Sequence, residues 1–165
     1  MMHRFVQHLF YFPWRLRQCF PRPVLDAIEH EITVAEGHHR GEIRFVIEAN
    51  LDLLQLVRGT TARTRALELF SELHVWDTEE NSGVLVYLLL AERRVEIVAD
   101  RGINTKVRPE SWADVCRHMS QAFQRGQFET GALQGIREID AQLTVHFPTT
   151  GDRANELPNQ PLVLG

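Results

Sequence analysis

The sequence predicts an α/β fold: a small mixed β-sheet with helices on both faces, as in an α/β/α sandwich. Residues 84–90 form an unbroken apolar run, which is typical of a strand covered on both faces. Residues 94–99 alternate between polar and apolar side chains after a tight turn, as the second strand of a hairpin does. Apolar residues recur at helical spacing around these strands, which favours helices packed against the sheet.

The first half of the chain predicts a helix, a strand and a crossover. The helix is expected to begin at Pro23, because proline suits a first helical turn, and to end at Gly37. Residues 42–48 are rich in β-branched and aromatic side chains and predict a strand. Residues 50–59 follow as a crossing loop with a short helical turn. We expect this strand to lie parallel to residues 84–90, since such crossovers return to the same sheet with a right-handed turn.

The remaining chain predicts three more helices. Thr60 or Thr61 can cap a helix that ends near Leu73, before an acidic loop and the buried strand. After the hairpin, one helix is expected from Pro109 and a last one from about Glu129. The predicted order of elements is therefore α–β–α–β–β–α–α.

The chain has 165 residues, of which 44% are hydrophobic and 24% are charged, and this excludes collagen, coiled-coil and disulfide-scaffold classes. We predict a basic, aromatic N-terminal arm (residues 1–22), a single α/β domain (residues 23–148) and a flexible C-terminal tail (residues 149–165). Cys19 and Cys116 lie too far apart in sequence to form a CxxC metal knuckle.

The N-terminal arm differs in charge from the rest of the chain. Through residue 25 the chain has four arginines and no acidic residue, whereas the remainder has 14 basic and 22 acidic residues. The arm also has six of the 14 aromatic residues. Two interpretations stay open: the arm binds an anionic membrane surface or an unknown protein partner, or its aromatic side chains pack onto the domain. The net charge of −4 argues against a nucleic-acid partner.

The start of the chain also bears on localisation. The apolar stretch at residues 6–14 is short, is interrupted by Pro13 and lacks a small-residue cleavage site, which disfavours a secretory signal. No apolar run approaches the ~20 residues of a membrane-spanning helix. We therefore expect a cytoplasmic protein whose membrane contact is peripheral.

The acidic loop before the buried strand is the candidate functional site. Asp77, Glu79 and Asn81 alternate as the oxygen ligands of a calcium loop do, but Leu88 stands where an EF-hand has its bidentate glutamate. The two ends of a hairpin lie side by side, so Asp100 is expected beside this loop. Oxygen ligands of this kind suit Mg²⁺ or Ca²⁺.

The sequence therefore predicts a weak divalent-cation site formed by four of five candidate residues: Asp77, either Glu79 or Glu80, Asn81 and Asp100. The alternative is an ordinary turn, in which Asp77 or Thr78 bonds the local backbone and the glutamates are solvated. The sequence assigns no catalytic residue and no other cofactor.

Three segments of the chain resemble the TPM domain family. Residues 81–89 (NSGVLVYLL) are similar to the family's strand entry Asn-Asn-Gly-Val-Leu, and residues 94–103 (RVEIVADRGI) to its second hairpin strand. Residues 123–131 (FQRGQFETG) are similar to its F-x-x-G-x-[FY]-x-x-G turn. The resemblance covers about residues 41–147 and implies an α/β/α sandwich. Family members include a thylakoid protein reported as an acid phosphatase, photosystem repair factors and bacterial membrane-anchored proteins with divalent-metal sites.

The sequence departs from the family pattern at Ser82, which replaces the second asparagine, and at Asp100, which replaces a glycine. The absence of a signal sequence and of a C-terminal anchor suggests a cytoplasmic branch. The chain also has none of the nucleophile or phosphate-loop motifs CxxxxxR, GxSxG or GxxxxGK[ST]. We therefore expect a non-enzymatic binding or assembly module associated with membrane-linked partners. The alternative is a divalent-metal-dependent phosphatase that acts on phosphomonoesters.

Overall fold

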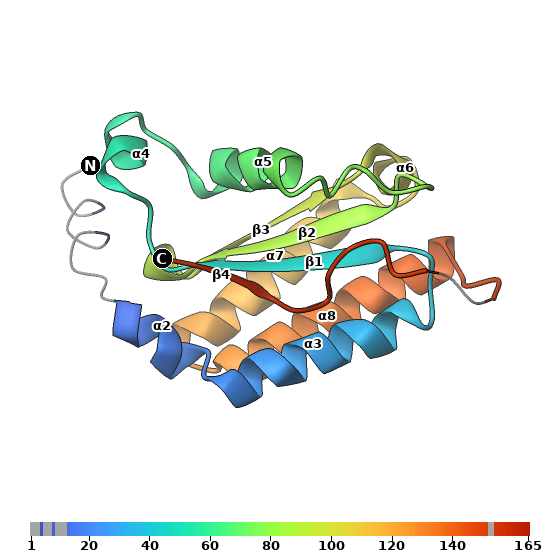
Figure 1. Cartoon of the computed structure of the whole chain (residues 1–165), viewed down its shortest axis with the longest axis horizontal. Helices are drawn as coiled ribbons and strands as arrows, with labels where there is room; N and C mark the ends of the chain where they lie inside the picture. Colours follow the sequence, from blue (N-terminus) through green and yellow to red (C-terminus); the bar gives the residue numbers. More distant parts are fainter. Residues whose placement is uncertain (1–3, 5–7, 9–12, 152–153) are drawn as a thin grey trace.

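The computed structural model describes residues 4, 8, 13–151 and 154–165, which form a four-stranded sheet between layers of helices (Figure 1). The elements in chain order are α2 (Pro13–Cys19), α3 (Arg22–Glu36), β1 (Glu42–Glu48), α4 (Leu53–Val57), α5 (Ala62–Glu72), β2 (Gly83–Leu89), the 3-10 turn η1 (Leu90–Glu92), β3 (Arg94–Ala99), α6 (Arg101–Asn104), α7 (Pro109–Gln124), α8 (Phe128–His146) and β4 (Leu162–Leu164).

The strands lie in the order β3-β2-β1-β4. β2 runs parallel to β1, with Val84 opposite Ile43, and antiparallel to β3, with Val84 opposite Ala99. Every residue of β2 is buried, because the strand lies inside the sheet and helices cover both of its faces. The predicted parallel and antiparallel neighbours of the apolar run are therefore confirmed.

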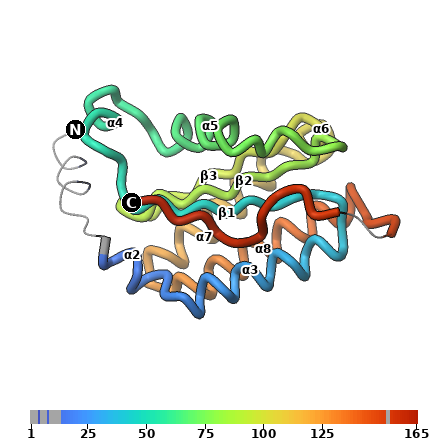
Figure 2. Tube along the Cα trace, viewed as in Figure 1, coloured from blue at the N-terminus to red at the C-terminus, as the bar shows by residue number. Residues whose placement is uncertain are grey.

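Helices cover the two faces of the sheet unequally (Figure 2). α3, α7 and α8 pack on one face, where Val84, Val86 and Leu88 contribute to the larger apolar core. α4 and α5 lie on the other face, where Leu85 and Tyr87 belong to a second core cluster. The alternate residues of one strand thus serve two cores, and the predicted α/β/α sandwich is confirmed.

Local sequence signals explain where the helices begin. The hydroxyl of Thr61 accepts a hydrogen bond from the backbone N–H of Thr64, so it caps α5 as predicted. α7 begins at Pro109, where a missing backbone donor is tolerated. Gly37 follows α3 as predicted, although its φ of −72° is right-handed and needs no glycine.

The end of the N-terminal arm is part of the domain core. Leu16 and Phe20 are buried, and the Phe20 ring packs edge-on against Phe123 and Phe128, with ring centroids 6.2 and 5.5 Å apart. Packing of arm aromatics onto the domain is thus observed for Phe20. Four other aromatic residues of the arm lie outside the described residues: Phe5, Phe10, Tyr11 and Phe12.

The predicted flexible tail is wrong for residues 154–165. Leu162–Leu164 form β4, which runs parallel to β1 with Leu162 opposite Val46. Arg44 of β1 donates hydrogen bonds to the carbonyl oxygens of Pro158 and Gln160, at 2.9 and 2.5 Å. The tail therefore adds a strand to the sheet through contacts with residues more than a hundred positions away.

Replacing Arg44 with methionine is expected to loosen this strand. Arg44 is buried, and desolvation lowers the pKa of its guanidinium. Its hydrogen bonds to the tail offset the cost of burying this charged group. Methionine keeps an apolar stem but removes both bonds, and hydrogen bonds to charged groups contribute about 1.5–3 kcal/mol each. We expect amide hydrogen exchange at residues 157–164 to accelerate at least tenfold, with α7 unchanged, when measured by mass spectrometry.

The matched control is Arg94→Met, which removes an exposed guanidinium from β3. In this variant the amide hydrogens of residues 157–164 should exchange at the wild-type rate. Unchanged exchange at residues 157–164 in Arg44→Met would show that strand pairing with β1 alone holds the tail.

The outer edge of β3 is occupied by side chains. Arg63 of α5 donates to the carbonyl oxygen of Ile97 at 2.6 Å, and Asn104 of α6 donates to that of Ala99 at 2.6 Å. The N–H of Val95 donates to the hydroxyl of Ser120 at 3.3 Å. Backbone groups that would otherwise point to solvent are thus bonded within the chain.

Candidate functional site

The acidic loop between α5 and β2 lies against the start of α6. The backbone N–H of Asp100 donates to the carbonyl oxygen of Gly83 at 2.9 Å, as the predicted hairpin geometry requires. Gly102 lies so close that a Cβ atom there would be 2.5 Å from the carbonyl oxygen of Asn81. The structure therefore brings Asp100 to the loop, and a glycine at position 102 permits the close approach.

Guanidinium groups bind the loop oxygens. Arg40 Nη1 is 2.7 Å from Glu80 Oε1, and Arg101 Nε donates to Asn81 Oδ1 at 3.1 Å. Asp77 and Glu79 are exposed. Two of the five candidate ligands, Glu80 and Asn81, thus already bind arginine side chains.

The residues as they lie do not fit a resident Mg²⁺ or Ca²⁺ ion. In the part of the chain that the structure describes, no group of three or more His, Cys, Asp or Glu side chains is placed to hold a metal. One observation favours a polar ligand: Asp100 Oδ2 is buried without a hydrogen-bond partner among the described residues. A single carboxylate oxygen falls well short of the six to eight ligands that Ca²⁺ takes.

The loop is also stabilised by its own hydroxyl groups. Thr78 Oγ1 accepts a hydrogen bond from the N–H of Ser82 at 2.9 Å. Ser82 Oγ donates in turn to the carbonyl oxygen of Arg40 at 2.9 Å. The local hydrogen bonding by Thr78 agrees with the ordinary-turn alternative, and Ser82, where the sequence departs from the family pattern, connects the loop to Arg40.

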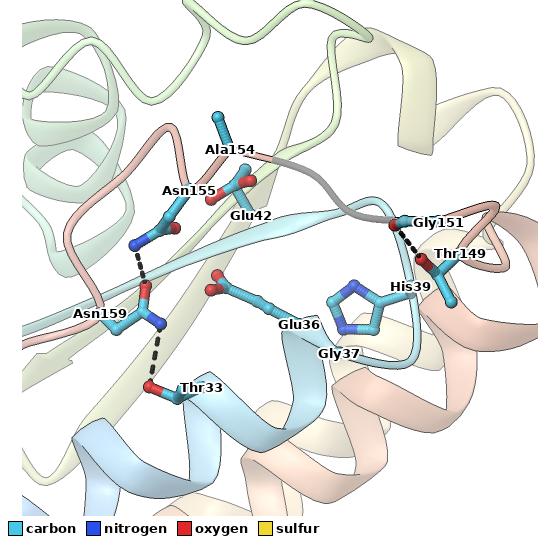
Figure 3. Close-up of a pocket in the computed structure, with 10 residues that line it drawn as sticks. All are labelled: Thr33, Glu36, Gly37, His39, Glu42, Thr149, Gly151, Ala154, Asn155 and Asn159. Atoms are coloured by element: carbon cyan, nitrogen blue, oxygen red, sulfur yellow. Dashed lines mark hydrogen bonds between the residues drawn. The ribbon is translucent and has the colours of Figure 1, made fainter.

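A polar pocket of about 370 Å³ lies between the end of α3, the start of β1 and the tail (Figure 3). Glu36 accepts a hydrogen bond from the N–H of Ile43 at 2.8 Å, and Glu42 accepts one from the N–H of Leu157 at 3.3 Å. Asn159 donates to the hydroxyl of Thr33 at 3.0 Å. The sequence did not indicate this pocket, because its walls come from distant segments and the tail showed no signal of ordered structure.

A buried polar network lies on the α5 side of the sheet. Tyr87 donates its hydroxyl hydrogen to Glu48 Oε2 at 2.5 Å, and Arg65 Nε lies 3.2 Å from each oxygen of the same carboxylate. Burial and the charge of Glu48 raise the pKa of Tyr87 above its ordinary value, so the phenol keeps the proton that it donates to Glu48 to a higher pH than a solvent-exposed tyrosine does. This network stabilises β1, β2 and α5 against one another.

Glu92 in η1 accepts hydrogen bonds from Arg4 and His8, the two described residues among the first twelve. His8 Nδ1 accepts a hydrogen bond from the N–H of Leu51 at 3.0 Å, so its Nε2 has the hydrogen that bonds Glu92 Oε1 at 2.9 Å. Arg4 Nε donates to the same oxygen at 2.6 Å. The hydrogen bond from His8, together with Arg4, holds the pKa of the Glu92 carboxyl below its usual range although the group is partly buried.

Cys116 on α7 is a poor candidate nucleophile. Burial, with the charge of Glu96 as a smaller cause, raises the pKa of its thiol to about 11. Thiolates rather than thiols react as nucleophiles, so this side chain is in its unreactive form at neutral pH.

An exposed apolar patch lies on α4. Leu53, Leu54 and Val57 are 65%, 56% and 68% exposed, whereas Leu56 on the same short helix is buried. A capping box between Asp52 and Gln55 fixes the start of the helix. Three large apolar side chains are therefore held in solvent on an anchored helix; we call them the α4 patch. None of the helices in the described part of the chain is both long and apolar enough to cross a membrane.

Comparisons with known proteins agree with this architecture. The model of the family described as TPM domain matches residues 18–142. Among solved structures, the chain is similar to the NMR structure of the BA42 protein from the psychrophilic bacterium Bizionia argentinensis, with 28% identity and a TM-score of 0.75 over 86% of this chain and 92% of that chain. No curated protein matches. The chain belongs to the TPM domain family.

Proposed function

We propose that this TPM domain is a non-enzymatic binding module that docks on an anionic membrane surface, where it meets membrane-linked partners, and that the α4 patch is its contact. The observation that carries the proposal is the exposure of Leu53, Leu54 and Val57. Their neighbour Leu56 is buried, so α4 cannot turn these side chains inward without exposing another leucine.

Burial of apolar area gives such a patch its affinity. Fully burying a leucine or valine side chain contributes about 1.5–3 kcal/mol, and the interface between headgroups and acyl chains provides an apolar environment. Three adjacent side chains thus supply enough free energy for reversible attachment, and a helix of five residues inserts no deeper than the interface.

Positive charge near the patch favours anionic lipids. Arg58 follows Val57 directly and is exposed. α2, with exposed Arg15 and Arg17, lies toward the same end of the molecule but on the other face of the sheet (Figure 2), so Arg58 is the arginine closest in sequence to the patch. Each arginine near an anionic surface adds about 1 kcal/mol of attraction, which salt weakens.

Co-sedimentation of the full chain with phosphatidylcholine vesicles, with and without phosphatidylserine, tests the proposal. We expect binding to the anionic vesicles that weakens as salt rises. The double variant Leu53→Ser/Val57→Ser should bind at least tenfold more weakly, because it removes two of the three apolar side chains. The control is Val145→Ser, which changes a 74% exposed valine on α8, outside the patch.

Two outcomes would contradict the proposal. Equal binding by the α4 variant and the wild type would remove the patch as the contact, and no binding to any vesicle would remove the membrane as the partner. Hydrolysis of an aryl phosphate that requires Mg²⁺ and is lost in Asp100→Asn would instead favour the alternative, a metal-dependent phosphatase that acts on phosphomonoesters.

A further inference from the structure

Arg40 is held firmly beside the acidic loop. Its backbone N–H donates to the carbonyl oxygen of Phe147 at 2.8 Å, and its own carbonyl oxygen accepts the hydroxyl hydrogen of Ser82. From this fixed backbone its side chain reaches Glu80, with 2.7 Å between Nη1 and Oε1, in a partly buried ion pair. The loop and the segment that precedes β1 are thus bound to each other through both backbone and charge.

Arg101 also contacts the loop, through Asn81. It is the first residue of α6, and Asp100 caps that turn by accepting the N–H of Arg101 at 2.6 Å. Gly102 allows the turn to lie directly on the loop backbone. Asn81, at a left-handed φ of 52°, presents Oδ1 to Arg101 Nε at 3.1 Å.

From these contacts we propose that Arg40 and Arg101 act as built-in cations of the acidic loop and exclude a divalent ion from it. A side-chain oxygen that accepts a guanidinium hydrogen bond is unavailable as a ligand, and each guanidinium also repels a second cation. The buried Oδ2 of Asp100 is then one oxygen of a cation site in which two other candidate ligands, Glu80 and Asn81, are bound to arginines. The inference concerns the loop alone and is independent of the α4 patch.

Removal of the arginines should therefore create divalent-cation affinity. The double variant Arg40→Gln/Arg101→Gln frees Glu80 and Asn81 in a loop that also has exposed Asp77 and Glu79 and that borders buried Asp100. Oxygens of this kind are the ligands that Ca²⁺ and Mg²⁺ prefer. We expect a gain because the variant both restores ligands and lowers the local positive charge.

The experiment is a titration of the full chain with Ca²⁺ and, separately, Mg²⁺, followed by the NMR amide shifts of residues 77–83. The wild type should show no saturable shift up to about 10⁻³ M, the weak end of protein calcium sites. The double variant should saturate with an apparent Kd at least tenfold lower. Adding Asp100→Asn to it should reverse the gain.

The matched control is Arg108→Gln/Arg125→Gln, which changes the net charge equally at two exposed arginines outside the loop. It should behave as the wild type. Saturation of the wild type with the Kd of the double variant would overturn the inference, and so would a folded double variant that binds neither ion. If Arg40→Gln proves unstable, Arg101→Gln alone, at an exposed residue, should still tighten binding measurably.

Discussion

Replacing Leu88 with aspartate is expected to unfold the domain. Leu88 is fully buried near the end of β2, between Ile47 of β1 and Val95 of β3, and it belongs to the larger core. A carboxylate there has no cation to pair with among its strand neighbours, and burying an unpaired charge is among the most destabilising of substitutions. We expect a loss above about 4 kcal/mol, comparable with the whole stability of a small domain.

Urea unfolding followed by circular dichroism measures this loss. Leu88→Met conserves volume and should cost less than about 1.5 kcal/mol. Leu67→Asp, at a half-exposed leucine on α5, should change stability by about 0.5 kcal/mol. A cooperative Leu88→Asp transition within 1 kcal/mol of the wild type would show that β2 is less enclosed than the sheet order implies.

Replacing Glu48 with alanine should have the second-largest effect. The carboxylate accepts from the Tyr87 hydroxyl and from Arg65, and its removal leaves a buried phenol and a largely buried guanidinium without their main acceptor. Breaking a buried charged pair by removing one partner costs about 3–5 kcal/mol. The same urea unfolding experiment gives the difference, and Glu48→Gln should be milder because it keeps an acceptor.

Tyr87→Phe separates the contribution of the phenol and adds a test at alkaline pH. Because the folded-state pKa of Tyr87 is raised, its neutral form is favoured in the native protein. An unfolded tyrosine ionises at about pH 10, so the stability that Tyr87 contributes should decline as pH rises above that value. Tyr87→Phe should lack this part of the decline. An identical alkaline profile in the two proteins would contradict the raised pKa.

Local patterns in the sequence were sufficient for the main strands and helices. β2 was predictable because seven consecutive apolar residues leave few alternatives to a doubly covered strand, and the start of α5 because Thr60 and Thr61 can both cap a helix. β4 was not, since three residues after a polar stretch have no periodicity. Its position depends on Arg44, a contact that no local pattern contains.

The candidate site, too, was predictable from the sequence only in part. The hairpin geometry correctly placed Asp100 beside the loop, because strand pairing fixes which residues are neighbours. The partners of the loop oxygens were not predictable. Arg40 is forty residues from Glu80, and nothing in the sequence indicates which of the 18 basic residues pairs with this glutamate. The network around Glu48 was hidden because its tyrosine lies within an otherwise apolar run.

The side chains along the outer edge of β3 have a consequence for behaviour at high concentration. A strand edge is ordinarily a template on which another molecule can pair, and such pairing begins many aggregates. At this edge an incoming chain would first have to displace Arg63, Asn104 and Ser120 from the backbone of β3. These side-chain hydrogen bonds therefore oppose the pairing of another strand with β3, and they discourage growth into larger assemblies on that side.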